Sequence, residues 1–193
     1  MAVNKTGIPL NGISILKSIA DQGSGQFETI FLENWPRVYG LLLRLVGDQA
    51  EAEDLALETF MHLYQRPPED NPVINLGGWL HRVAVNLGLN ALRSWQRRQR
   101  YEEKAGQLDL MEKSTVSPSE IFTVEEEHRN VRKVLAGMNT RQSQILILRY
   151  SGMAYKEIAA IMNLAPSSIG PLLVRAETEF EKRFQLSESG VDK

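Results

Sequence analysis

The sequence predicts an all-α protein built from two small helical domains. Apolar residues recur at intervals of three and four over most of the chain, which is the spacing of amphipathic helices. No alternation of apolar and polar residues is long enough to predict a strand. A polar, acidic stretch from Tyr101 to Glu120 interrupts the helical spacing and divides the chain in two.

Three helices are expected in the first half. The first begins near Phe27, and Pro36 should kink or restart it because proline removes a backbone donor. Gly47 should end this helix, and Asp48 should cap the next one with Glu51 as the partner of a capping box. The second helix is expected to end near Gln65 and the third to span about 76–100.

Helical spacing resumes at Ile121 and again after a cap at Asn139 or Thr140. The expected organisation is a mobile N-terminal tail at residues 1–25, a first domain at 26–101, a linker at 102–120, a second domain at 121–186 and a C-terminal tail at 187–193.

Composition limits the kind of protein. The 193 residues are 42% hydrophobic and 24% charged, as in ordinary globular proteins, and the chain has no cysteine. This excludes disulfides, thiol nucleophiles and thiolate metal sites, and it suits a reducing cytoplasm. The N-terminus lacks the pattern of a signal peptide, and nowhere do 18 apolar residues stand together, so we expect a cytoplasmic protein without membrane insertion.

Charge is distributed in blocks of alternating sign, although the net charge is only -2. Residues 27–66 carry -4 and residues 101–127 carry -6, whereas residues 82–100 and 128–160 carry +5 each. Acidic and basic surfaces in one chain indicate at least two partners of opposite charge.

The third expected helix carries a polar stripe. At 100° per residue its apolar face consists of Leu80, Val83, Ala84, Leu87, Ala91 and Trp95. The opposite side carries Arg82, Asn86, Asn90, Arg93, Arg97 and Arg100, and Trp79 falls within this polar stripe. Arginines suit phosphates, asparagine amides suit base edges, and an indole can stack on an unpaired base. The combination therefore favours single-stranded or melted nucleic acid, although a solvated helix face remains the alternative.

Two longer motifs give a resemblance. The runs "AEAEDLALETFMHLYQ" and "GGWLHRVAVNLGLNALRSWQRR" resemble region 2 of bacterial sigma factors, and "LAGMNTRQSQILILRYSGMAYKEIAAIMNLAPSSI" resembles region 4. The chain as a whole resembles the short, two-domain extracytoplasmic-function (ECF) type over about residues 27–185. The resemblance implies core RNA polymerase and promoter DNA as partners, an anti-sigma factor as a further one, and no cofactor.

The resemblance also implies site residues. The acidic helix would face the polymerase with Glu51, Glu53, Asp54, Leu57 and Glu58, where Ala56 and Leu57 would form an apolar centre inside a charged rim. The melted promoter strand would lie on Trp79, Arg82, Asn86, Asn90, Arg93 and Arg97. Simple solvation of the acidic helix is the alternative.

The segment from Tyr155 to Val174 has the spacing of a helix-turn-helix. Its core positions are Ile158, Ala159, Met162, Leu164, Ile169 and Leu172, and Asn163 should adopt the left-handed conformation of the turn. The outward positions of the second helix hold Gly170 and Pro171 where the family commonly has basic residues, so base readout should be weak. Backbone contacts to upstream promoter DNA are expected instead from Arg149, Lys156, Ser167, Ser168 and Arg175, with Arg141 nearby.

Pro171 also bears on where that second helix begins. We expect a start at Ser168, which would place Pro171 within the first turn, or else a kink at Gly170–Pro171.

Two other kinds of function are alternatives to a sigma factor. A sigma-like regulator that binds DNA, polymerase or an inhibitor without initiating transcription would fit the weak reading helix. An enzyme is disfavoured, because His62, His81 and His128 are far apart in sequence and the single Glu-x-x-His at Glu125 has no second copy to build a di-metal site.

Overall fold

The computed structural model describes residues 25–66, 76–106 and 120–189 of the chain. Within this described part there are seven helices and no strand, so the predicted all-α class is confirmed. The helices are α2 (Gly25–Val46), α3 (Gln49–Gln65), α4 (Leu76–Gly106), α5 (Glu120–Gly137), α6 (Thr140–Tyr150), α7 (Tyr155–Met162) and α8 (Pro166–Glu188). Residues 1–24 and 190–193 of the expected tails and residues 107–119 of the expected linker lie outside the described residues. The described remainder is helical, since residue 25 begins α2, residues 102–106 end α4 and residues 187–188 end α8.

Helices α2, α3 and α4 form an N-terminal bundle around an aromatic core. The ring of Phe31 lies between Trp35, at a centroid distance of 4.9 Å, and Phe60, at 4.6 Å. All three side chains are almost completely buried. Burial of such large rings supplies much of the hydrophobic stabilisation of a three-helix domain. Pro36 lies inside α2, which continues through it as one helix.

The turn between α2 and α3 follows the sequence pattern. Gly47 has a φ of 77°, which only glycine adopts at little cost, and its N–H donates to the carbonyl of Leu43. Asp48 is the N-cap of α3, and its Oδ1 accepts from the N–H of Glu51 at 2.8 Å.

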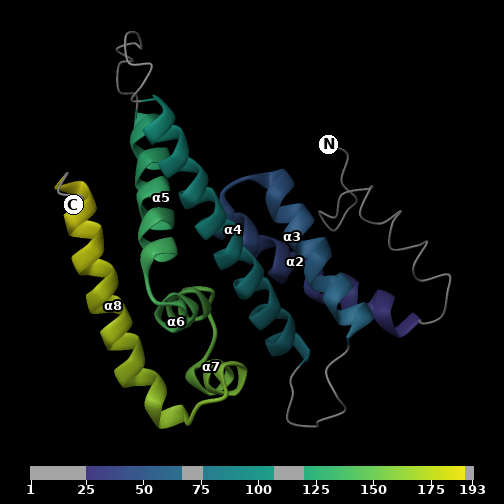
Figure 1. Ribbon diagram of the computed structural model, residues 1–193. Helices are drawn as coiled ribbons and strands as arrows, with labels where there is room; N and C mark the ends of the chain where they lie inside the picture. The colour runs from purple at the N-terminus through teal and green to yellow at the C-terminus, as the bar shows by residue number, and fades with distance from the viewer. Residues whose placement is uncertain (1–24, 67–75, 107–119, 190–193) are drawn as a thin grey trace.

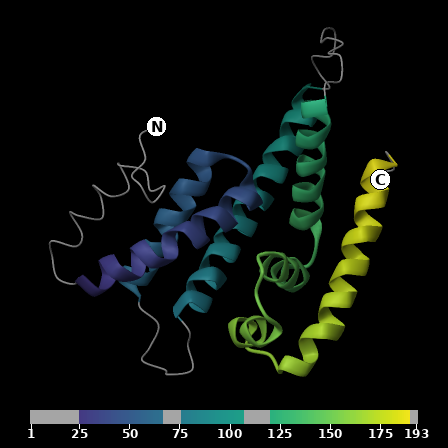
Figure 2. The same cartoon turned by 180° about the vertical axis from the view of Figure 1, so that it is seen from behind.

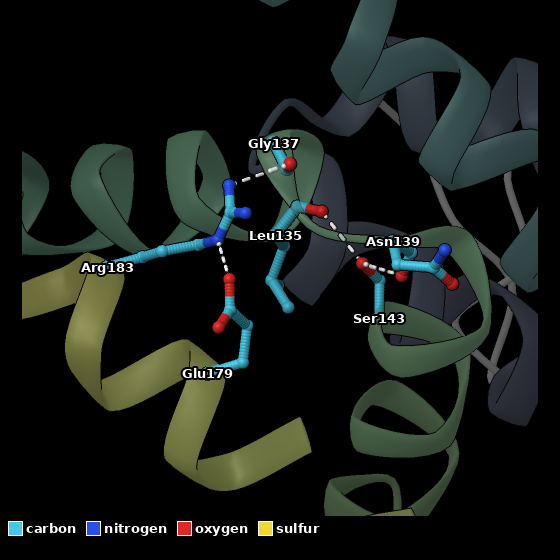
Figure 3. Close-up of polar contacts among 6 residues, drawn as sticks. All are labelled: Leu135, Gly137, Asn139, Ser143, Glu179 and Arg183. Carbon is cyan, nitrogen blue, oxygen red and sulfur yellow. Dashed lines mark hydrogen bonds and ion pairs between the residues drawn. The ribbon is translucent and has the colours of Figure 1, made fainter. Parts of the chain in front are cut away.

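Helices α5 to α8 form a C-terminal bundle whose helices are tied at the end of α5. Figure 3 shows two side chains that donate to carbonyl oxygens in its last turn, which lack partners within the helix. The buried hydroxyl of Ser143 on α6 donates to Leu135 at 2.8 Å, and the guanidinium of Arg183 on α8 donates to Gly137 at 2.9 Å. Arg183 is also paired with Glu179 one turn earlier, so the contact fixes α8 beside α5.

The two bundles pack on each other across α4, which lies between α2 and α3 on one side and α5, α6 and α7 on the other (Figure 1). The view from behind gives the same order, with α8 at the outer edge of the C-terminal bundle (Figure 2). Helix α4 therefore supports both halves of the molecule.

Packing on two sides changes the buried face expected for α4. Leu80 and Ala84 are buried as predicted, but Val83, Leu87, Ala91 and Trp95 are only half-buried. Val85, Leu89 and Leu92 are buried instead, because a helix covered from two directions has no single apolar stripe. The helix also extends to Gly106, past its expected end near Arg100.

Candidate polymerase and nucleic-acid interface

The acidic residues expected to face polymerase lie on α3. Asp54 and Glu58 are exposed, Glu51, Glu53 and Leu57 are half-buried, and α3 packs mainly on α2 and α4. Partial burial raises the pKa of Glu53 above its usual value, and the neighbouring Asp54 carboxylate adds to the rise. The surface is thus acidic and open, with Leu57 as its apolar centre.

Ala56 does not belong to that surface. Its side chain is completely buried in the N-terminal bundle, so the prediction that Ala56 forms part of an exposed apolar centre is wrong. At position 56 the helix faces α2 and α4, whereas Leu57, one residue further around the helix, remains half-exposed.

The polar stripe of α4 is largely on the surface. Arg82, Asn86, Asn90 and Arg97 are exposed, and Arg93 is half-buried. Trp79 is half-buried and packs against the hydrophobic core, so only part of its indole is open for stacking. Next to it, His81 is buried with its Nδ1 2.7 Å from the carbonyl of Gly77, and burial lowers the pKa of its imidazole.

Two residues of this stripe contact the C-terminal bundle. The Nε2 of Gln144 donates to Oδ1 of Asn86 at 2.5 Å, and the guanidinium of Arg93 donates to the hydroxyl of Thr140 at 2.9 Å. Next to the bond between Gln144 and Asn86 lies a cavity of about 340 Å³, which is bounded by Arg82 and Asn86 on α4 and by the start of α6. The sequence predicted binding roles for Asn86 and Arg93 but no contact of either residue with Gln144 or Thr140, since local spacing carries no information on contacts between domains.

The helix-turn-helix is formed by α7, the turn after it and α8. Ile158, Ala159 and Ile169 are buried, and Asn163 has φ 53° and ψ 54°, the left-handed conformation expected of it. Met162, Leu164 and Leu172 are half-buried and pack against the core, and Leu173 is buried beside them. The spacing therefore predicted this motif well.

The start of α8 was predicted wrongly. It begins at Pro166 rather than Ser168, with Ala165 as N-cap, because a proline at the first helical position needs no N–H partner. Pro171 consequently lies inside the helix, after the first turn. The kink at Gly170–Pro171 stays a prediction.

The residues expected to contact the DNA backbone lie on α6, α7 and α8. Lys156, Ser167 and Arg175 are exposed, and Ser168 is half-buried. Arg149 is exposed as well, but its guanidinium lies 5.3 Å from the centre of the Tyr155 ring and donates to the carbonyl of Met153. These contacts hold Arg149 close to the N-terminus of α7.

Across residues 25–66, 76–106 and 120–189, no cluster of three histidine or acidic side chains is placed to hold a metal ion. Over the same ranges no single helix has the length and apolar character to cross a bilayer, although α7 and α8 pass that test as a pair bent by 93°. The apolar residues of this pair include Ile158, Ile169 and Leu173, which are buried inside the C-terminal bundle.

Family models match both bundles. The model of sigma-70 region 2 matches residues 30–99, and that of sigma-70 region 4 matches residues 128–179. The RNA polymerase sigma factor CarQ of Myxococcus xanthus is 26% identical over 172 residues, which are 89% of this chain and 94% of CarQ. The ECF RNA polymerase sigma factor SigE of Mycolicibacterium smegmatis is 26% identical over 155 residues, or 79% of this chain, which spans only 60% of SigE.

A solved structure shares the fold. CnrH, determined in complex with the cytosolic domain of CnrY, has a TM-score of 0.52 and 16% sequence identity, covering 87% of this chain and 94% of that one. The likeness extends over both bundles and concerns the fold alone.

Fold and matches together define a helical transcription factor with a helix-turn-helix in its C-terminal half. The two family models cover more than half of the chain, and the chain belongs to the sigma-70 family of RNA polymerase sigma factors, in its ECF branch. This is a family of transcription initiation factors that bind core RNA polymerase and promoter DNA.

Proposed function

We propose that this chain binds core RNA polymerase through α3, directs it to promoters, and holds the melted strand on α4. The observation that carries the proposal is the separation of an acidic surface on α3 from a surface of amides, arginines and an indole on α4. The chain itself catalyses no reaction, and it acts in the cytoplasm, where an anti-sigma factor is a further partner.

The polymerase contact is proposed for Asp54, Glu58 and Leu57, with Glu51 and Glu53 at the edge. Exposed carboxylates around a half-exposed leucine fit the polar rim and apolar centre of a protein interface. Carboxylates at the rim mainly accelerate association with a basic partner surface, and the leucine contributes buried apolar area.

The melted strand is proposed to lie along α4. Arg82, Arg93 and Arg97 would neutralise phosphates, whereas Asn86 and Asn90 would reach base edges. The exposed part of the Trp79 indole would stack on a base next to them. An unpaired strand can follow these groups along one helix face without the width of a major groove.

The helix-turn-helix is proposed to bind upstream DNA through its backbone. Ser167 and Ser168 lie in the first turn of α8, where backbone N–H groups favour a phosphate oxygen. Lys156 on α7 and Arg175 further along α8 would add phosphate contacts. Arg149 would add a further phosphate contact. Gly170 and Pro171 offer no side chain to base edges, so we expect recognition by shape rather than by direct readout.

That same pair of residues favours a second candidate function, a sigma-like regulator that binds polymerase or an anti-sigma factor without initiating transcription. The double variant Trp79→Ala/Asn86→Ala separates the two. If the chain initiates transcription, this variant should lose promoter opening and keep polymerase binding. If the chain is only a regulator, its activity should be unchanged.

The decisive experiment mixes the purified chain with core polymerase and a promoter library. We expect a stable complex and initiation from a defined set of promoters. Asp54→Lys/Glu58→Lys should weaken the complex by about tenfold or more, and Glu181→Lys/Glu188→Lys, a matched charge reversal on exposed positions of α8, should not. Absence of any complex with the unaltered chain would reject the proposal.

A further inference from the structure

The outward face of α8 near its start carries no charged side chain. At about 100° per residue, its members lie within about 60° of one another around the helix axis and all are exposed: Ser167, Pro171, Val174 and Thr178. The buried side chains of the same turns lie on the opposite side: Ile169, Leu173 and Ala176. Packing of this inner side in the C-terminal bundle therefore fixes which residues of α8 are presented outward.

Val174 is the large apolar side chain of this outward face. It is 61% exposed, although it lies in the middle of a well-formed helix. The hydroxyl of Thr178 donates to the carbonyl of Val174 at 2.9 Å and is thus occupied within the helix. The ring of Pro171 has neither a donor nor an acceptor. Two methyl groups of valine are consequently the main means by which this face can contact a base.

Charges around the face favour a phosphate backbone beside it. Arg175 follows Val174 in the chain and is exposed, as is Lys156 on α7. Two nearby carboxylates are engaged within the bundle. Glu157 accepts from the N-cap N–H of α7 at 2.7 Å, and Glu177 accepts from a tyrosine hydroxyl of α6 at 3.3 Å. The flanking cations can therefore bind phosphates while the uncharged face lies toward the bases.

The chemistry of the major groove decides which base an exposed valine tolerates. Thymine presents a C5-methyl group there, whereas the other bases present mainly donors and acceptors. An apolar side chain placed against a donor or acceptor displaces its water and forms no hydrogen bond in return. Contact between a valine and a thymine methyl group instead removes apolar surface of both from water.

We propose that Val174 contacts the C5-methyl group of a thymine in the upstream promoter element, and that the chain thereby selects duplexes with a T·A pair at that position. The inference rests on the proposed function of the helix-turn-helix. It adds one apolar base contact to the recognition by shape, because polar readout is absent from this face. Val174 is then a residue that determines specificity for upstream DNA.

The test uses deoxyuridine, which differs from thymidine only in lacking the methyl group. In a promoter from which the chain initiates, each upstream thymine on either strand is replaced in turn, and the affinity of the complex of chain and core polymerase is measured. We expect one position at which affinity falls about fourfold, which corresponds to ~0.8 kcal/mol. No loss at any position would overturn the proposal.

Variants of the valine assign the effect to its side chain. Val174→Ala should bind the thymine and uracil duplexes equally at the sensitive position, whereas Val174→Ile should keep the preference for thymine. Because the side chain is exposed, both variants should retain the helical circular dichroism of the unaltered chain. A preference that persists in Val174→Ala would come from the shape of the DNA and would overturn the proposal.

The matched control is Leu186→Ala, at an apolar residue of α8 that is 46% exposed and lies three turns further along the helix. This control should keep the fourfold preference, and its loss there would contradict a specific role of Val174. A protein contact is the competing use of the face. If Val174→Ala weakens the complex with core polymerase in the absence of DNA and leaves the thymine preference intact, the face binds protein and the proposal fails.

These outcomes distinguish the two proposals. If the unaltered chain forms no complex with core polymerase, the proposed function fails and no promoter exists for the uracil substitutions. If the chain initiates transcription but uracil is tolerated at every upstream position, the function stands and only the thymine contact fails.

Discussion

His81 is a buried imidazole at the boundary between the two bundles. Its Nδ1 donates to the carbonyl of Gly77, which favours a neutral ring with the proton on that nitrogen. Burial lowers its pKa, as does Arg37 on α2 to a smaller extent, whereas the Gly77 carbonyl and Glu157 on α7 act in the opposite direction. His81 is thus a packed side chain whose protonation lowers the stability of the folded state, rather than a ligand.

This predicts a pH dependence of stability. The folded state binds the proton of His81 less readily than the unfolded state, so the contribution is complete above pH 6.5 and is lost as pH falls below that value. In urea unfolding between pH 7.5 and 5.5, His81→Gln should lose less stability than the unaltered chain. His128→Gln, at an exposed position, should behave like the unaltered chain, and equal pH slopes for all three would contradict the prediction.

Two glycines with positive φ give a second prediction. Gly152 has φ 89° with open space around it, so Gly152→Ala should cost about 1–2 kcal/mol in unfolding free energy from backbone strain alone. Gly47→Ala should cost a similar amount, because the added methyl group would meet only the guanidinium of Arg132, the far end of a flexible side chain that can move aside. The cost should therefore be the same in an Arg132→Ala background, and a smaller cost there would show that the contact with Arg132 contributes to it.

At the scale of helices, the sequence predicted nearly every element and missed what depends on neighbours. The sequence predicted the cap at Asp48, the left-handed Asn163 and a cap at Asn139 or Thr140, of which Asn139 is the observed one, because residues within one turn determine these features. The start of α8 was predicted wrongly, because two prolines compete for the first turn and the helix tolerates Pro171 in its interior while Pro166 takes the first helical position. The buried face of α4 was half missed, because periodicity cannot reveal a second packing partner.

The start of α8 also predicts how DNA binding could be strengthened. A side chain at Gly170 would meet only Tyr155, at 3.9 Å, so Gly170→Arg should be accommodated and should point a cation toward the proposed upstream DNA. Duplex affinity should rise, and the slope of log K against log salt should steepen by about 0.9 for one added phosphate contact. Gly170→Gln is the uncharged control, and an unchanged slope for the arginine variant would contradict the placement of DNA at this helix.

At the scale of the whole molecule, the sequence predicted which residues share a face of α4, but it did not predict how that face contacts the C-terminal bundle. Arg82, Asn90 and Arg97 lie on one exposed face as the helical spacing indicated. Their neighbours Asn86 and Arg93 are bound to residues about fifty positions away in the chain, and no local pattern predicts such a contact.

The packing of the bundles predicts how the molecule unfolds. All three tryptophans, at positions 35, 79 and 95, belong to the N-terminal bundle, so tryptophan fluorescence reports on that bundle while circular dichroism reports on all helices. If the bundles stabilise each other, the two signals should change at the same urea concentration. Thr140→Ala/Gln144→Ala should move the transitions apart, and separate transitions in the unaltered chain would mean that the contact adds little stability.

Val85 carries a consequence for solubility. It is buried and borders the same cavity as Leu148 and Ile161 of the C-terminal bundle, so a molecule whose two bundles separate would present these apolar side chains to water. An opened chain without a partner would therefore be prone to self-association, and its tendency to form oligomers should grow with protein concentration. Packing of the two bundles on each other would then keep the molecule monomeric until polymerase binds the uncovered surface.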